Sequence, residues 1–280
     1  SVSCGAMSYV VSESNGSLKR NGAESQMDAP PFESINELGQ AGVLLVCDHA
    51  SNALPASYET LGLDSEHLDR HIAFDIGAAD VTRRMSRSLD APAVLSGYSR
   101  LLIDCNRQPG HSMSIPEISD NIKIPLNRAL SEEEVARRQA KYFKPFHGAV
   151  ERSLENFSSR GVVPAYVAMH SFTPTMNGYE RPWHVGILWN KDPRLAEPLI
   201  EILSAWSGIV VGYNQPYSGR DSEGYSIHTH GGDRGIPNVL IEVRQDLLDT
   251  HHGVELWSVR IGQAVSAVVS RLAPFEIRNY

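Results

Sequence analysis

Cysteine is scarce in this 280-residue chain, and its distribution argues against a disulfide framework. The three cysteines, Cys4, Cys47 and Cys105, are odd in number and form no CxxC pair. Such a set is typical of proteins kept in a reducing compartment, and a buried free cysteine usually serves as a small core residue. We therefore expect a cytoplasmic protein. A catalytic thiol at Cys47 is the alternative to a core role for that residue.

The chain also lacks a basic tract, an apolar run long enough to cross a bilayer, and the charged-then-apolar order of a secretory signal at its start. Its formal net charge is −8. Nucleic acid and anionic membranes are therefore not expected as partners, whereas local arginines can still bind a small anionic substrate. The sequence does not indicate an oligomeric state.

No internal repeat, low-complexity tract or linker interrupts residues 40–275, so one catalytic α/β domain over residues 36–280 is the simplest organisation. Residues 1–35 are rich in Ser, Gly, Asn and Glu and contain Pro30-Pro31. We expect them to form a flexible N-terminal arm.

Short apolar runs that alternate with helical patterns predict the fold. The expected strands are 43–47, 93–95, 101–103, 166–169, 184–189, 209–212 and 239–243. Helices are expected at 76–89, 195–206 and 254–272, and a further one opens at the capping box of Ser131 and Glu134 and runs toward Phe157. Pro145 should kink or break that helix. This order predicts a three-layer α/β/α sandwich around a mostly parallel mixed sheet.

Two histidines at strand ends are the strongest functional signal. His49 ends the run VLLVCDH, His170 lies in YVAMHS, and Glu242 lies in the late strand VLIEVR. Ligands gather at the carboxyl ends of strands in open α/β sheets. Two imidazoles with nearby carboxylates can hold a catalytic Zn²⁺ that keeps an open position. The sequence therefore predicts metal-assisted hydrolysis.

Asp75, just before a helix, is the expected third metal ligand, and its alternative role is as the helix N-cap. Asn52 and Asp48 are weaker candidates. Glu242 is the expected general base, with its pKa tuned by burial. The alternative for Glu242 is a structural ion pair with Arg244, two residues further on the same strand face.

Arginines flank a second polar segment, YSRLLIDCNR. Arg100, Asn106 and Arg107 are expected to bind a substrate carboxylate, since a guanidinium can grip it with two hydrogen bonds. Asp104 has the alternative role of a structural ion pair with one of these arginines.

The long polar loops at 108–125, 171–182 and 214–235 are expected to contribute further groups. Ser171 and Arg244 are expected to contact substrate, and His230 or Arg234 to act catalytically by stabilising a developing oxyanion. A nucleophilic Ser171 is the alternative, but no GxSxG pattern supports it.

Five stretches together resemble the N-formylglutamate amidohydrolase family. They are CDHASNALP (47–55), HIAFDIGA (71–78), YSRLLIDCNR (98–107), AMHSFTP (168–174) and HGGDRGIPNVLIEVRQDL (230–247). The resemblance implies a fold similar to the zinc carboxypeptidases (phosphorylase/hydrolase-like) and aspartoacylases. It also implies zinc on His49 and His170, and a base at Glu242.

The resemblance further implies that residues 104–107, with Arg100, bind the substrate carboxylate. One position departs from the HxxE pattern of those relatives, because Asn52 stands where they have a glutamate. The expected reaction is hydrolysis of an N-acyl amino acid, with N-formyl-L-glutamate as the leading substrate. The alternatives are a metallohydrolase for another N-acyl amino acid or small peptide, and a binding protein without turnover.

Overall fold

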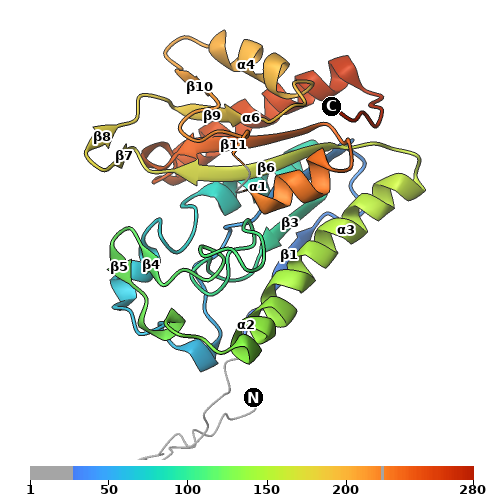
Figure 1. Ribbon diagram of the computed structural model, residues 1–280. Coiled ribbons are helices and arrows are strands. Elements are labelled where there is room, and N and C mark those ends of the chain that lie inside the picture. Colours follow the sequence, from blue (N-terminus) through green and yellow to red (C-terminus); the bar gives the residue numbers. More distant parts are fainter. Residues whose placement is uncertain (1–27, 222–223) are drawn as a thin grey trace, which may run out of the picture.

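A mixed seven-stranded sheet, in the order β1-β3-β2-β6-β11-β9-β10, organises the protein (Figure 1). The structure is a computed structural model and describes residues 28–221 and 224–280. The strands are β1 (Phe32–Ile35), β2 (Val43–Cys47), β3 (Ala93–Ser96), β6 (Ala165–Phe172), β9 (Val185–Leu188), β10 (Val211–Tyr213) and β11 (Asn238–Arg244). The four neighbours β3, β2, β6 and β11 run parallel, whereas β1 and β9 run antiparallel to β3 and β11.

Helices cover both faces of this sheet, as the sequence predicts. Side chains alternate between the faces, so Leu45 and Val167 pack in one apolar cluster and Leu44 and Tyr166 in another. Against the first cluster lie α1 (Ala78–Leu89), α4 (Ala196–Ser204) and α6 (His251–Leu272), and against the second lies α3 (Lys144–Ser159). The predicted three-layer sandwich is therefore confirmed.

The predicted N-cap is confirmed, because Ser131 Oγ accepts a hydrogen bond from Glu134 N at 3.2 Å and opens α2 (Glu132–Arg138), whereas the Glu134 carboxylate accepts from Tyr58, Arg137 and Arg138 and does not complete the capping box. A π-helical turn, η4 (Gln139–Phe143), then joins α2 to α3. It lies directly before Pro145, which lacks an amide donor and so cannot continue a regular ladder. The predicted interruption at Pro145 thus takes the form of a π-turn.

The predicted strand at 101–103 is wrong. These residues follow β3 as turns and coil, and Leu101 and Leu102 are buried in a third apolar cluster with Tyr58 and Ile72. The cluster lies under short elements and loops rather than beside a strand, so the run has no strand to pair with. Those elements are η1 (Ala56–Tyr58), η2 (Ser65–Asp69), η3 (Pro125–Asn127) and the hairpin β4 (Ile118–Ser119)–β5 (Ile122–Lys123). A second hairpin, β7 (Thr175–Met176)–β8 (Tyr179–Glu180), follows β6.

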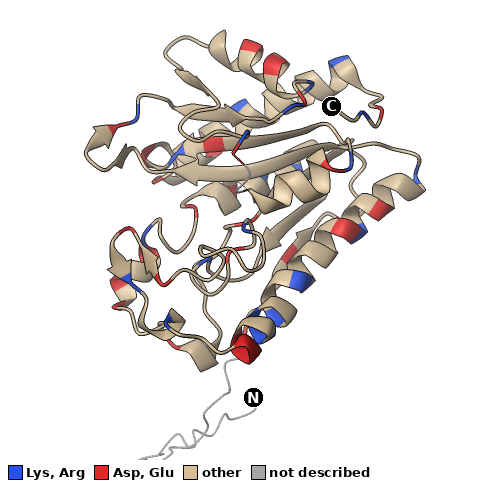
Figure 2. Ribbon diagram, viewed as in Figure 1, with Lys and Arg blue, Asp and Glu red and all other residues tan. Residues whose placement is uncertain are grey.

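The sheet begins earlier than the sequence indicates. β1 pairs antiparallel with β3, so residues 32–35 belong to the sheet and not to the expected arm. The expectation for residues 1–27 lies outside the described residues. Within the described ranges, no helix is long and apolar enough to cross a membrane. Acidic and basic residues are interspersed along α3 in Figure 2, in keeping with a sequence that has no basic tract.

Candidate active site and metal centre

The carboxyl ends of three parallel strands bring the predicted residues together. Asp48 and His49 follow β2, and His170 lies near the end of β6. Glu242 on β11 is the register partner of His170, so the two side chains emerge side by side from the same sheet face. This is the face that α3 covers further along the strands.

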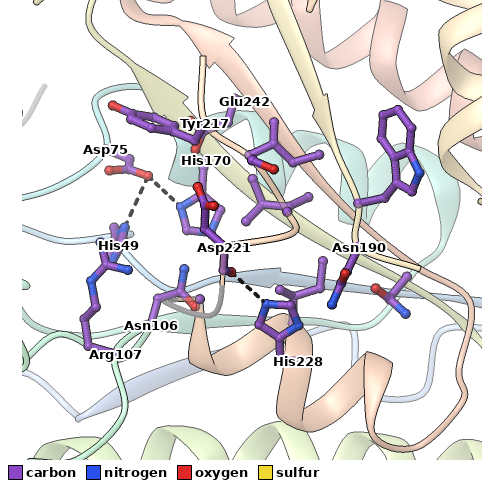
Figure 3. A pocket seen from close by; sticks show the side chains of 18 of the residues that line it. His49, Asp75, Asn106, Arg107, His170, Asn190, Tyr217, Asp221, His228 and Glu242 are labelled. Atoms are coloured by element: carbon purple, nitrogen blue, oxygen red, sulfur yellow. Dashed lines mark hydrogen bonds and ion pairs between the residues drawn. The ribbon is translucent and has the colours of Figure 1, made fainter. Parts of the chain in front are cut away.

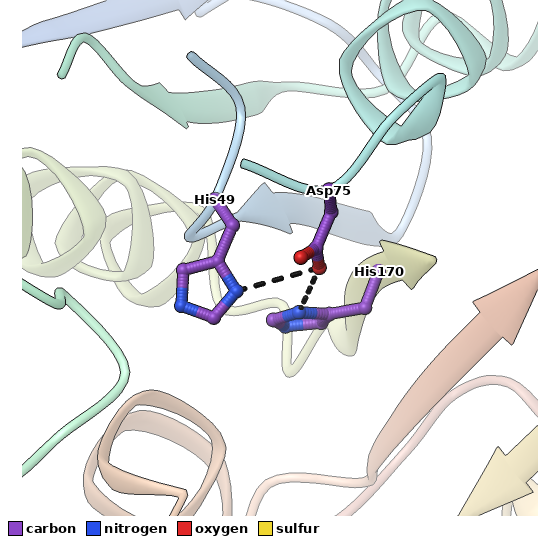
Figure 4. Close-up of side chains that lie close together, drawn as sticks. All are labelled: His49, Asp75 and His170. Carbon is purple, nitrogen blue, oxygen red and sulfur yellow. Dashed lines mark hydrogen bonds and ion pairs between the residues drawn. The ribbon is translucent and has the colours of Figure 1, made fainter. Parts of the chain in front are cut away.

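Three buried side chains converge on one point (Figure 4). Asp75 Oδ2 lies 3.3 Å from His49 Nδ1 and 2.8 Å from His170 Nδ1, and the two rings stand edge to face with centroids 5.0 Å apart. Asp75 does not cap α1, whose N-cap is Gly77. Its side chain turns to the histidines instead, so the helix-cap alternative is wrong.

Two further carboxylates fix the orientation of the histidine rings. Asp104 Oδ1 lies 2.7 Å from His49 Nε2, and Asp48 Oδ2 lies 3.1 Å from His170 Nε2. A carboxylate can only accept, so each Nε2 carries the hydrogen, and in a neutral ring the Nδ1 lone pair then points at Asp75. The outer carboxylates match the hydrogen-bonded partners that orient metal-ligating histidines elsewhere.

Two neutral imidazole lone pairs that face a carboxylate oxygen repel it, so this arrangement is favourable only when a ring is protonated or a metal cation lies between the groups. Burial lowers the pKa of His170, but the hydrogen bonds that its ring donates to the carboxylates of Asp48 and Asp75 outweigh burial and raise that pKa well above its ordinary value. The site therefore attracts positive charge. Two imidazole nitrogens and one carboxylate are also the donor set of catalytic zinc sites, so His49, Asp75 and His170 fit a divalent metal ion.

The side chain of Asn52 is turned to the η2 segment, where its amide nitrogen donates to Leu68 O at 3.0 Å, and Asp75 instead lies with the two histidines. Arg100 supplies positive charge beside the centre and forms ion pairs with two of its carboxylates. Its Nη2 lies 2.9 Å from Asp104 Oδ2 and its Nη1 3.5 Å from Asp75 Oδ1. The ion pair expected for Asp104 thus exists, and the same carboxylate also orients a histidine. Burial raises the pKa of Asp104, but Arg100 and His49 outweigh it and hold that pKa well below its usual range.

Glu242 borders a pocket of about 240 Å³ beside the three converging side chains (Figure 3). Burial raises its pKa from 4.5 to about 7. Its Oε2 is buried and has no hydrogen-bond partner among the described residues. Such a carboxylate has the properties of a general base that works near neutral pH.

Arg244 does not pair with Glu242 and does not line this pocket, so both roles expected for Arg244 are wrong. β11 ends at Arg244, and its guanidinium turns to Asp246 Oδ1 at 2.7 Å and to the carbonyl oxygens of Arg181 and Trp183 at 3.2 and 3.3 Å. These contacts tie the end of β11 to the segment before β9.

The expected substrate-binding groups other than Arg244 border the same pocket. Arg100, Asn106, Arg107 and Ser171 all line it. Asn106 Oδ1 accepts from Ser226 N at 3.0 Å, which fixes the amide. The remaining lining includes residues that the sequence analysis did not single out: Trp189, Asn190, Tyr217, Asp221, His228 and Asn238.

Neither alternative nucleophile is supported. Ser171 Oγ donates to Ile76 O at 2.8 Å and lies 3.2 Å from Gln245 Nε2, and no histidine base is among its partners in the described parts of the chain. Cys47 is fully buried on the other sheet face, and burial raises the pKa of its thiol well above the ordinary value. Cys47 and Cys105 are free and buried.

The structure does not bring His230 or Arg234 into the pocket lining. His230 is 1% exposed and points to His147, and Arg234 pairs with Glu151 at 3.4 Å. His228, two residues earlier in the same loop, lines the pocket instead. The loop predicted to contribute to the site does border the pocket, and its helical turn determines which of its residues face it.

The fold and site together define an α/β protein with a buried His-Asp-His group whose donors fit a metal ion. The sequence model of the N-formylglutamate amidohydrolase family matches residues 41–248, and the chain belongs to this family. The predicted resemblance is thereby confirmed.

Two solved structures resemble the protein along most of its length. A gene product of Agrobacterium tumefaciens is 32% identical, with a TM-score of 0.84 over 87% of this chain and 96% of the other. An N-formylglutamate amidohydrolase from Ralstonia eutropha is 18% identical, with a TM-score of 0.60 over 86% and 97%, and thus shares the fold. No curated protein matches the chain.

Proposed function

We propose that the protein hydrolyses the amide bond of an N-acyl amino acid, with N-formyl-L-glutamate and water giving formate and L-glutamate. The observation that carries this proposal is the convergence of His49 Nδ1, His170 Nδ1 and Asp75 Oδ2 beside Glu242 in one pocket. Membership of the N-formylglutamate amidohydrolase family supports the substrate class.

We propose that His49, Asp75 and His170 would hold the metal, with Zn²⁺ as the favoured ion. When bound, Zn²⁺ supplies a Lewis acid that polarises the acyl carbonyl and acidifies water. Asp104 and Asp48 keep both histidines in the tautomer that presents Nδ1 to this position.

Glu242 takes the proton of the attacking water and returns it to the leaving nitrogen. The water oxygen bonds to the acyl carbon, the C–N bond breaks, and the nitrogen leaves as the amine of the amino acid. The raised pKa of Glu242, about 7, suits both halves of this proton transfer.

Arg107 and Asn106 line the pocket and bind the carboxylates of the amino acid. Arg100 also lines the pocket, but its guanidinium already pairs with Asp104 and Asp75. The volume of about 240 Å³ is below the roughly 300–1,000 Å³ of pockets for drug-sized ligands, which favours a small substrate.

Substrate variants separate the proposal from its rivals. N-formyl-L-glutamate should release formate with a higher kcat/KM than N-formyl-L-glutamine, which lacks one carboxylate, and than N-acetyl-L-glutamate, which enlarges the acyl group. Preference for the acetylated compound or for a dipeptide would instead make the protein a metallohydrolase for another substrate. Binding of all these compounds without turnover by metal-loaded protein would support the binding-protein alternative.

A further inference from the structure

Behind the active site lies a pair of buried histidines, His147 on α3 and His230 in the π-helical turn η5 (His228–Gly232). They are 6% and 1% exposed, and neither lines the pocket. In Figure 1 the orange helical segment that ends in η5 lies between α3 and the sheet. The reaction proposed above gives these two residues no direct role.

Hydrogen bonding determines the tautomers of both rings. His147 Nε2 donates to the backbone oxygen of Cys105 at 2.8 Å, because a carbonyl can only accept. Burial lowers the pKa of His147, so its ring is neutral and its Nδ1 is an acceptor. His230 Nε2, 2.9 Å away, must then be the donor. Among the described residues His230 Nδ1 has no partner, as expected for the unprotonated nitrogen of a ring whose pKa burial lowers to about 3.

The acceptor at the end of this chain lies within the segment that builds one wall of the active site. Cys105 stands between Asp104, which orients His49, and Asn106, which lines the pocket. Asp104 Oδ1 also accepts from Asn106 N at 2.8 Å. A shift of the Cys105 carbonyl would therefore move both neighbours at once.

The helical segment that carries His230 is tied to the same wall at a second point. Tyr225 N donates to Asn106 O at 3.1 Å, and Ser226 N donates to Asn106 Oδ1 at 3.0 Å. The histidine pair thus links α3, the α5 (Tyr225–Ile227)–η5 segment and residues 104–107 from the side away from the pocket.

Aromatic packing holds the His147 ring in the one orientation that makes both hydrogen bonds. Phe143 and Phe146 lie at centroid distances of 4.2 and 5.0 Å, Tyr225 meets the ring edge to face at 4.9 Å, and His230 stacks on it at 5.1 Å. Phe143 ends the π-turn η4, and His230 lies in the π-turn η5. π-turns occur frequently at functional sites, and here two of them place the two rings.

We propose that His147 and His230 act as a positioning pair, which holds the Asp104–Arg107 segment in place and thereby sets the orientation of His49 and of the substrate-binding groups. This inference rests on the proposed metal centre and amidohydrolase function. The effect passes through the Cys105 carbonyl and involves no contact with substrate.

Substitution at His147 tests the pair. His147→Phe keeps an aromatic ring but removes both hydrogen bonds, whereas His147→Gln keeps an amide donor that can reach the Cys105 carbonyl. Leu154→Ala, on the same helix and buried in the same apolar cluster, is the control for a general loss of packing. Zinc affinity from chelator competition, kcat, KM and thermal stability are measured for all three.

His147→Phe should weaken zinc binding and lower kcat/KM by roughly 10- to 100-fold, the usual loss when a group that orients a metal ligand is removed. His147→Gln should stay close to wild type, and Leu154→Ala should lose thermal stability alone. Unchanged zinc affinity and kcat/KM in His147→Phe, or equal losses in Leu154→Ala, would overturn the proposal.

A second measurement covers the case in which His147→Phe does not fold. Histidine side-chain ¹⁵N spectra of the intact wild-type protein should show both rings neutral with hydrogen on Nε2, and any other tautomer of His147 would refute the proposed chain. Since zinc affinity and tautomers are read without substrate, they remain decisive if N-formyl-L-glutamate proves not to be the substrate.

Discussion

Replacement of Glu242 by glutamine should make the protein less active and more stable at the same time. The substitution nearly conserves volume and removes the proposed proton acceptor. General base catalysis contributes roughly 100- to 10,000-fold, so kcat should fall by that factor. KM and zinc content should stay close to wild type, because Glu242 is not among the three converging ligands.

The stability gain follows from the raised pKa of Glu242. Burial moves it from 4.5 to about 7, so the folded protein holds a proton that the unfolded chain releases. The stability that Glu242 contributes is complete below pH 4.5 and is lost as the pH rises through 7. At about 1.4 kcal/mol per pKa unit, the loss reaches about 3 kcal/mol. Glutamine has no charge to bury and avoids this loss.

Urea denaturation of the metal-free proteins at pH 5 and pH 8 measures the effect, and formate release by the zinc-loaded proteins measures activity. The two metal-free proteins should differ little at pH 5, and the variant should be more stable by up to about 3 kcal/mol at pH 8. A variant that keeps the wild-type kcat would refute the assignment of the base. A variant no more stable than wild type at pH 8 would refute the claim that burial raises the pKa of Glu242.

Three other perturbations test separate parts of the site. Asp104→Asn removes the carboxylate that accepts from His49 Nε2 and should weaken zinc binding by roughly 10- to 100-fold in chelator competition, and wild-type affinity would contradict the proposed orienting role. Arg107→Met should raise KM for N-formyl-L-glutamate at least about tenfold, the value of a charge-assisted hydrogen bond, whereas the matched Arg244→Met should leave KM unchanged. Burial lowers the pKa of His230 from 6.5 to about 3. Between these two pH values the ring stays neutral in the folded protein, whereas it is protonated in the unfolded chain. Wild-type stability should therefore fall below pH 6.5 by up to about 1.4 kcal/mol per pH unit more than that of His230→Gln, and equal slopes in urea titrations would contradict this.

The sequence was sufficient to predict the centre because that part of the site depends on strand geometry. Apolar runs that end in polar residues placed His49 and His170 at the carboxyl ends of parallel strands, and β11 registers Glu242 beside His170. Asp75 was identifiable because it lies just upstream of a helix that packs on the same sheet, three residues before its first residue Ala78. The positions of His170 and Glu242 follow from period-two alternation, and that of His49 from the end of its strand, both of which a single sequence displays.

The loop-borne residues could not be predicted because no periodicity fixes where a long loop folds back. Tyr217 and Asn190 reach the pocket through irregular segments, and the π-turn at residues 228–232 brings His228 to the pocket and turns His230 away from it. The prediction that Arg244 shares the strand face of Glu242 failed because Arg244 is the last residue of β11, where the alternation of side chains ends. The strand predicted at 101–103 is absent because an apolar segment buried under loops has the same composition as a buried strand.

Zinc content and formate release, measured on the same sample, test the central claim most directly. The purified protein should contain close to one zinc per chain, lose formate release from N-formyl-L-glutamate on chelation, and regain it when zinc is restored. A protein that lacks both His49 and His170 should neither retain zinc nor release formate. Full activity after complete removal of metal would contradict the proposed centre.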